Sequence, residues 1–182
     1  KGDNRLLSQL CSEHGVDLTS VPPVLPGSKT ISSTRIRKCI EEGNVCEASE
    51  MLGYCYSIRG KVVKGKGLGS SMGFATANTD ILNSDKAVPK KGVYFTSVKT
   101  GADTFFGVSN IGQNPTLGGI GLNLETHIFD MDSDIYGKDI EIGFIRRLRD
   151  EMRFDSKEEL AYAVRKDIAE GKNLVREMRN KI

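Results

Sequence analysis

The sequence contains no tryptophan, and only 2 of its 182 residues are histidine. Its formal net charge is +2, so it lacks both the strong positive charge and the tryptophan rings expected of a nucleic-acid stacking platform. No apolar run is long enough to cross a membrane, and no signal-peptide pattern opens the chain. These absences predict a soluble, cytoplasmic protein without a nucleic-acid or membrane partner.

The cysteines show no C-x-x-C spacing; they are Cys11, Cys39, Cys46 and Cys55. Isolated cysteines of this kind favour reduced thiols in a cytosolic protein over a disulfide framework or a metal site. The chain begins at Lys1 and not at methionine, so we expect it to be a piece of a longer protein.

The hydrophobic pattern changes near residue 53. Before that point the period is helical, with segments expected at 5–11, 31–43 and 44–52, where Asn44 caps the last of them. Pro22 and Pro23 interrupt this half, and the residues before them predict a short strand leading into a loop.

After residue 53 the period becomes two. Alternating segments predict strands at 54–63, 92–99, 104–110, 122–129 and 139–148, joined by turns and not by helices. This order predicts an antiparallel sheet or closed barrel. Ser156 and Glu159 then form a capping box that begins a C-terminal helix, which Gly171 is expected to weaken near its middle.

A glycine-rich stretch follows the first of these strands, although the chain has no Walker-type G-x-x-x-x-G-K-[ST] motif. Gly65, Gly67 and Gly69 could expose backbone N–H groups to a phosphate, or they could form an ordinary hairpin turn. Thr76 and Asn78 come next, and on an extended segment they point to the same side. Their neutral oxygens suit Mg²⁺, and the alternative is a turn that satisfies its own backbone.

Glu125 is the candidate for proton transfer. In the segment LNLETHIF, Leu124 and Thr126 share one face, which leaves Glu125 and His127 on the other. A carboxylate there could accept a proton from an attacking hydroxyl, or it could be a solvated strand residue. We expect His127 to be structural, because no second ligand lies at metal-binding spacing.

Taken together, these motifs resemble one family. The second half of the chain resembles the riboflavin kinase module of bacterial bifunctional riboflavin kinase/FAD synthetases, through GKVVKGKGLGSSMGFATAN, KGVYFTSV, GVSNIGQNPT, ETHIFDMDSDIYGK and IRRLRDEMRFDS. The segment KTISSTRIRKCIEEG resembles the end of the FMN adenylyltransferase (nucleotidyltransferase) domain of the same enzymes. The resemblance therefore implies two domains, with the end of the adenylyltransferase domain at 1–52 and the riboflavin kinase domain at 53–182.

The resemblance implies a mainly β fold: a six-stranded antiparallel Greek-key barrel with a C-terminal helix, preceded by a mostly helical remnant of an α/β domain. It implies phosphorylation of riboflavin to FMN with ATP and Mg²⁺, with Glu125 as the catalytic carboxylate and Thr76 and Asn78 at the metal and phosphate. The remaining implied ATP-binding positions are Gly65, Gly67, Gly69, Ser70, Ile128, Asp130 and Tyr136. The implied flavin-binding positions are Arg149, Met152 and Phe154, and the implied nucleotide motif of the first half is Ser32, Ser33, Thr34 and Arg35.

The chain departs from the family pattern at two positions. Ala75 stands where the family usually has proline, so the turn that presents Thr76 loses a fixed φ. Ser70 stands where bacterial members usually have arginine, which removes one charge facing the phosphates. The adenylyltransferase motif H-x-G-H is absent from this stretch, so we expect the intact protein, but not this stretch alone, to convert FMN to FAD.

Two other interpretations stay open at this point. Barrels of this size also serve as non-catalytic binding modules, here for flavin or nucleic acid. The departures at Ser70 and Ala75 also leave room for a degraded or regulatory relative of the enzyme.

Overall fold

The computed structural model describes residues 4–21, 31–65, 69, 73–82, 86–113 and 122–180, and the chain forms two compact units, Lys1–Ser32 and Ser33–Ile182. The first unit contains helix α1 (Asn4–His14). Its leucines Leu6, Leu7 and Leu10 are all exposed. Residues 16–21 do not form the predicted strand, because the described part of this unit offers no second extended segment to pair with.

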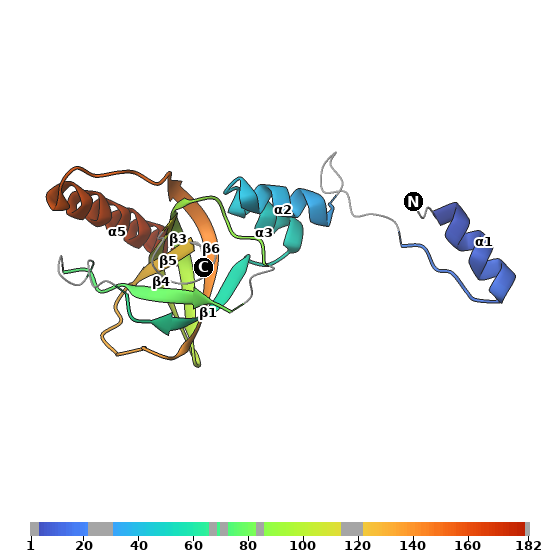
Figure 1. The fold of residues 1–182 in the computed structure, drawn as a ribbon, viewed down its shortest axis with the longest axis horizontal. Coiled ribbons are helices and arrows are strands. Elements are labelled where there is room, and N and C mark those ends of the chain that lie inside the picture. The colour runs from blue at the N-terminus through green and yellow to red at the C-terminus, as the bar shows by residue number, and fades with distance from the viewer. Residues whose placement is uncertain are drawn as a thin grey trace. The chain divides into compact units, whose positions relative to one another are not determined.

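The second unit is built around a closed barrel (Figure 1). The strands run in the order β1-β2-β5-β4-β3-β6, and every neighbouring pair is antiparallel. Their bounds are β1 (Ser57–Val63), β2 (Ala77–Ile81), β3 (Gly92–Thr100), β4 (Asp103–Gln113), β5 (Leu122–Ile128) and β6 (Asp139–Arg149). Together with the C-terminal helix α5 (Lys157–Arg179), they confirm the predicted six-stranded barrel and helix.

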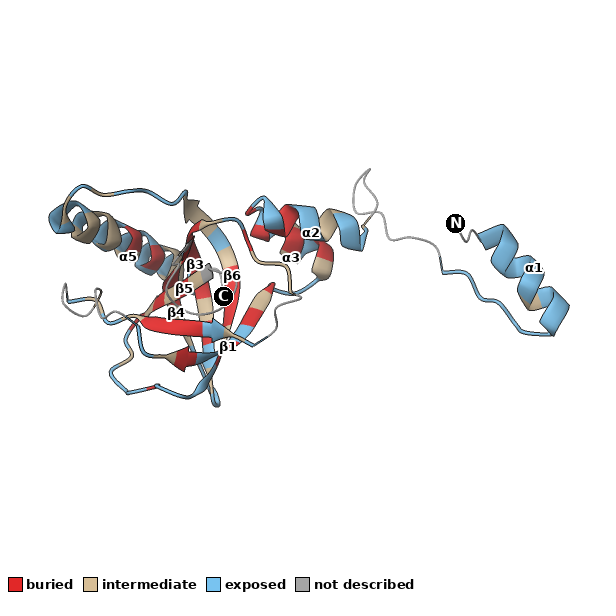
Figure 2. Ribbon diagram, in the orientation of Figure 1, coloured by how far each residue is buried: buried red, intermediate tan, exposed pale blue. Residues whose placement is uncertain are grey.

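Alternating side chains fill the barrel interior, and Figure 2 shows buried stretches along the strands. Tyr94 and Phe144 meet edge to face, with ring centroids 5.4 Å apart. Three buried hydroxyls form a chain, in which the Oγ1 of Thr96 lies 2.9 Å from Ser109 Oγ and that atom lies 2.8 Å from Thr126 Oγ1. These three hydroxyls are therefore hydrogen-bonded to one another.

Helix α5 covers the outer face of the barrel over β3 and β4. The buried residues Val93, Phe95, Val108 and Phe129 form a cluster against which Ile168, Leu174 and Val175 of the helix pack. Ser156 caps the helix as predicted, because its Oγ accepts a hydrogen bond of 3.1 Å from the backbone N–H of Glu159.

Gly171 of α5 packs against this cluster. A Cβ at Gly171 would lie 2.8 Å from Phe129 Cζ and 3.0 Å from Val108 Cγ2. The helix continues unbroken through this residue. The glycine therefore permits a close approach of helix to barrel, a role that helix propensity alone did not indicate.

Two short helices precede the barrel in the same compact unit: α2 (Ser33–Glu41) and α3 (Val45–Leu52). Asn44 occupies the predicted N-cap position of α3, although its side chain makes no capping hydrogen bond. Gly43 and Gly53, which follow the two helices, adopt φ values of 83° and 76°. The division into domains at 1–52 and 53–182 stays a prediction.

Candidate active site

Asn78, Glu125 and Asn110 lie next to one another across three adjacent strands. In the antiparallel register Asn78 of β2 is opposite Glu125 of β5, which in turn is opposite Asn110 of β4. Leu124 and Thr126 are 1% and 0% exposed in the barrel interior, so the alternation of the strand places Glu125 on the outer face, as predicted. Directly opposite residues have Cβ atoms about 4.5–5.5 Å apart. The predicted metal ligand and the predicted base are therefore immediate neighbours.

Two glycines pack against the two predicted metal ligands. A Cβ at Gly65 would lie 2.0 Å from Asn78 Nδ2, and a Cβ at Gly69 would lie 2.9 Å from Thr76 Oγ1. No larger residue fits at either position while these side chains keep their places. The missing side chains of Gly65 and Gly69 thus leave the space that the Asn78 and Thr76 side chains occupy, and we call this space the cradle.

These oxygens fit the chemistry of a hard divalent cation. Mg²⁺ prefers oxygen ligands and retains several waters, so it needs few side chains when phosphate supplies the rest. Among the residues that the structure describes, no group of three or more His, Cys, Asp or Glu is placed to hold a metal ion. The Thr76 and Asn78 oxygens fit a cation that also binds a phosphorylated substrate.

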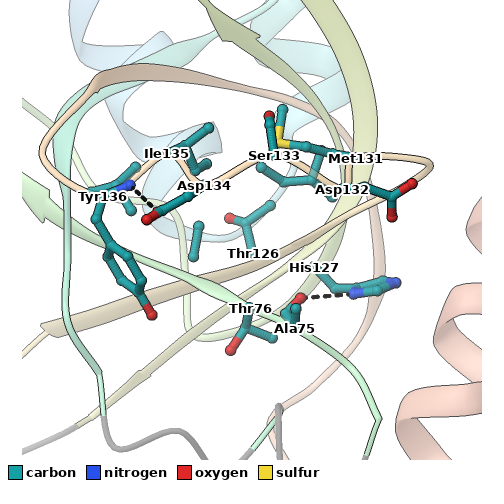
Figure 3. A pocket seen from close by; sticks show the side chains of 13 residues that line it. Ala75, Thr76, Thr126, His127, Met131, Asp132, Ser133, Asp134, Ile135 and Tyr136 are labelled. Carbon is teal, nitrogen blue, oxygen red and sulfur yellow. Dashed lines mark hydrogen bonds between the residues drawn. The ribbon is translucent and has the colours of Figure 1, made fainter.

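A cavity of about 440 Å³ lies on one side of Thr76 (Figure 3). The segment 131–136 borders one side of it, and Ala75 and Thr76 border the other. Ile128 and Tyr136, two of the predicted nucleotide-binding residues, also line it. Asp130 does not; it adopts φ 56° in the turn after β5 and forms an ion pair of 3.6 Å with Lys172.

A second cavity, of about 260 Å³, lies between the outer face of the barrel and α5. The predicted residues that line it are Gly69, Thr76, Glu125, Arg149, Met152 and Phe154. Leu160, Val164 and Ile168 add an apolar wall from the helix. Thr76 and His127 line both cavities, so the two spaces meet at these side chains.

Arg149 is held by a carboxylate that the sequence did not single out. Its Nε and Nη2 donate hydrogen bonds of 2.9 Å and 2.8 Å to Oδ1 and Oδ2 of Asp167, which is buried on α5. The guanidinium also lies over the ring of Phe154, 5.9 Å from its centroid. Because Asp167 neutralises the charge of Arg149, the planar face of the guanidinium is the part best suited to a flat ligand. Asp167 could have been found in the sequence by its position, because it is a carboxylate on the same helix face as the apolar Val164 and Ile168.

The backbone beyond Arg149 is fastened by a second arginine. Arg147 donates hydrogen bonds of 2.7 Å to the carbonyl of Lys91 and 2.8 Å to Asp150 Oδ1. Hydrogen bonds from Arg147 and then from Lys90 hold the pKa of the exposed Asp150 carboxyl below its usual value. These contacts anchor the start of the segment that carries Met152 and Phe154.

His127 fastens the segment at Ala75, where the family resemblance predicts a proline. Its Nδ1 lies 2.9 Å from the carbonyl oxygen of Ala75, and because that oxygen only accepts, Nδ1 is the donor. Phe74 packs edge-on against His127 with centroids 6.2 Å apart, and Arg165 of α5 lies over the Phe74 ring. The imidazole therefore restrains the turn before Thr76 by contact, where a proline would restrain it through φ.

Asn123 is a further residue that the sequence did not single out. Its Nδ2 donates a hydrogen bond of 2.6 Å to Oε1 of Glu125. Asn123 could have been found by its spacing from Glu125, because residues two apart on a strand point to the same face.

The remaining predicted residues lie elsewhere or outside the described chain. Ser33, Thr34 and Arg35 open the first turn of α2, directly after Ser32, and Arg35 forms an ion pair with Glu47. A helix N-terminus presents free N–H groups suited to phosphate. Gly67 and Ser70 lie outside the described residues.

Comparison with known proteins gives a consistent family match. A family model described as "Flavokinase: Riboflavin kinase" matches residues 52–175. The chain is 38% identical over 168 residues to the bifunctional riboflavin kinase/FMN adenylyltransferase of Escherichia coli (strain K12), covering 92% of this chain and 53% of that protein. The protein of the same name from Listeria monocytogenes is 37% identical over 152 residues, covering 83% of this chain and 48% of that protein. The chain thus spans about half the length of the curated relatives it matches.

One solved structure shares both fold and sequence with the chain. It is the crystal structure of a protein from Streptococcus pneumoniae called a macrolide-efflux protein, with a TM-score of 0.80 and 35% identity over 88% of this chain and 52% of that one. In the part of this chain that the structure describes, no helix is long and apolar enough to span a membrane.

Proposed function

The chain belongs to the riboflavin kinase family, and we propose that it transfers the γ-phosphate of ATP to the 5′-hydroxyl of riboflavin, giving FMN and ADP. The observation that carries this proposal is the junction of two cavities at Thr76 and His127, with Glu125 lining the second. Transfer between two substrates requires that their reacting groups meet while the rest of each molecule is held apart. Two cavities that share one wall supply this arrangement.

We assign the nucleotide to the cavity bordered by Ile128 and Tyr136, and the flavin to the cavity beneath α5. The second cavity is mostly apolar on its helix side and carries the Arg149 guanidinium, which lies over the Phe154 ring; this suits a flat ring system. Arg149 is already paired with Asp167, and Glu125 and Glu151 line the same cavity. This balance of charge favours a neutral ligand such as riboflavin over an anionic one in the flavin position.

In the proposed reaction the 5′-oxygen of the ribityl chain forms a bond to the γ-phosphorus. The bond between that phosphorus and the β,γ-bridging oxygen breaks, and the hydroxyl proton passes to the Glu125 carboxylate. Thr76 and Asn78 would hold Mg²⁺, which when bound supplies positive charge to the transferring phosphate. Because such transfers depend mainly on positioning and charge, the cradle formed by Gly65 and Gly69 serves the reaction by keeping both side chains in place.

The relatives are named as bifunctional enzymes, so we further propose that the whole protein also adenylylates FMN to FAD. The first turn of helix α2, at Ser33–Arg35, is the part of this chain that would serve that second activity. All four cysteines are free, which supports a reducing, cytoplasmic location.

The test is product formation. Riboflavin is incubated with the protein, ATP and Mg²⁺, and the products are separated by chromatography with flavin fluorescence as the readout. We expect FMN in amounts that depend on both ATP and Mg²⁺. Quenching of riboflavin fluorescence without any FMN would instead favour a non-catalytic flavin-binding barrel.

A further inference from the structure

The Glu125 carboxylate has a hydrogen-bond donor on its own strand. Asn123 Nδ2 donates to Glu125 Oε1 over 2.6 Å, and both side chains leave the same outer face of β5 because they are two residues apart. The contact is partly buried, and Glu125 lines the cavity beneath α5. Hydrogen bonds to an ionised acceptor are shorter and stronger than neutral ones, and water competes less well for a partly buried one.

The direction of this hydrogen bond follows from the chemistry of the two groups. An ionised carboxylate only accepts, so the amide of Asn123 must present its NH₂ group to Glu125. Because Asn123 engages Oε1, Oε2 is the oxygen left to accept a proton from a substrate hydroxyl. A glutamate side chain has several rotatable bonds, and the contact reduces the number of orientations that the carboxylate samples.

The opposite strand leaves room for this arrangement. Gly112 of β4 is the register partner of Asn123, and the absence of a side chain there leaves room for Glu151 and Asn110. A Cβ at Gly112 would lie 2.8 Å from Glu151 Oε1 and 3.2 Å from Asn110 Nδ2. The neutral amides of Asn123 and Asn110 therefore lie beside Glu125, and Glu151 lines the same cavity.

We propose that Asn123 is a positioning residue that orients the Glu125 carboxylate toward the substrate hydroxyl. This inference rests on the proposed kinase function and on Glu125 as the base. A misoriented base slows the chemical step more than it weakens substrate binding. Loss of a hydrogen bond to a charged group then predicts a fall in kcat of about 10- to 100-fold in Asn123→Ala.

The experiment compares four proteins: wild type, Asn123→Ala, Glu125→Gln and the double variant. The rate of FMN formation is measured over a range of riboflavin concentrations at saturating ATP and Mg²⁺. In Asn123→Ala we expect kcat to fall as stated, while KM for riboflavin changes less than about threefold. In the Glu125→Gln background, Asn123→Ala should change kcat less than about twofold, because the carboxylate that Asn123 orients is already gone.

Two further variants separate positioning from folding. Asn123→Asp keeps the shape of the side chain but replaces the donor with a second carboxylate, so it should lower kcat at least as much as alanine does. Asn173→Ala, an exposed asparagine on α5 that does not line either cavity, should keep the wild-type kcat. Thermal unfolding of each variant checks that the barrel is intact.

The outcomes distinguish this inference from the proposed function. Absence of FMN with the wild-type protein would overturn the kinase function and this inference together. FMN from the wild type with an unchanged kcat in Asn123→Ala or Asn123→Asp would overturn this inference alone. An equal fall in kcat for Asn123→Ala in the wild-type and in the Glu125→Gln background would also overturn it, because Asn123 would then act independently of the carboxylate.

Discussion

Asn78 on β2 and Glu125 on β5 are register partners at the seam where these two strands pair. The residue proposed to hold the metal and the residue proposed to take the proton are thus fixed to each other by backbone hydrogen bonds. Any change that shifts one strand along the other would separate the two functions at once. Single side-chain substitutions near the β2–β5 seam, which leave the strand pairing in place, can therefore test the metal site and the base separately.

Gly65→Ala tests the cradle around Asn78. The added Cβ would lie 2.0 Å from Asn78 Nδ2, so the amide must move from its place. We expect the Mg²⁺ concentration for half-maximal rate to rise about tenfold or more, because a displaced ligand oxygen binds the cation less well. The measurement is FMN formation against Mg²⁺ concentration. In an Asn78→Ala background the same glycine substitution should add little, and a full additional loss there would show that Gly65 acts by another route.

Asp167→Asn tests the support of Arg149. The substitution keeps the shape of the side chain but removes the charge that binds Arg149 through hydrogen bonds of 2.8 and 2.9 Å. A released guanidinium holds the flavin less well, so KM for riboflavin should rise about tenfold while KM for ATP stays within about twofold. Steady-state kinetics with each substrate varied in turn gives both values. An equal rise in both KM values would argue against a flavin-specific role.

Gly171→Ala tests the close approach of α5 to the barrel. Helix propensity alone favours alanine over glycine by about 1 kcal/mol. The added Cβ would meet Phe129 and Val108 at 2.8 and 3.0 Å, and overpacking of this kind costs about 1–3 kcal/mol. We therefore expect a lower urea midpoint for the variant, with Asn173→Ala as an exposed control on the same helix. A raised midpoint for Gly171→Ala would show that the helix moves away without cost.

Glu141→Gln tests a pH-dependent contribution at the β1–β6 seam. A hydrogen bond of 2.6 Å from Ser57 and a contact of 2.9 Å with Arg59 hold the pKa of the Glu141 carboxyl below its ordinary value. The unfolded chain then takes up this proton at a higher pH than the folded protein does. The stabilisation is therefore complete above the unfolded pKa of about 4.3, and it is lost as the pH falls through the lower folded pKa.

The measurement is the urea midpoint of wild type and Glu141→Gln between neutral and acidic pH. The difference between the two proteins should be largest near neutral pH and should shrink below about pH 4. In a Ser57→Ala background the pH-dependent part should be smaller, since the main cause of the lowered pKa is removed. A difference that stays constant over the whole range would contradict the assignment.

The sequence predicted most of the barrel because five of its strands alternate apolar and polar residues. Strand β2 was not among the five, since Ala77–Ile81 is short and mostly polar. Thr79 is buried there in the barrel interior opposite Leu124, and Asn78 is buried on the outer face against Gly65, so neither is buried by its own hydrophobicity. The outward direction of Glu125, in contrast, was predictable from the sequence. Glu125 lies between Leu124 and Thr126, which share the opposite face of the strand.

The contacts that support the site were not predictable from local pattern. His127 and Ala75 are 52 positions apart, and Arg149 and Asp167 are 18 apart, so only the folded chain brings each pair together. Gly171 was interpreted from helix propensity, whereas its role depends on two side chains from other strands and turns. The roles of Thr76, Asn78 and Glu125 in catalysis stay predictions.

The most direct test of the account is kcat for FMN formation by wild type and Glu125→Gln, measured together with riboflavin binding. A general base contributes about 10²- to 10⁴-fold to such a rate, so the account predicts a fall of that size with riboflavin binding retained. Wild-type turnover in Glu125→Gln would contradict it, because the proton would then leave the hydroxyl without the carboxylate that lies opposite Asn78.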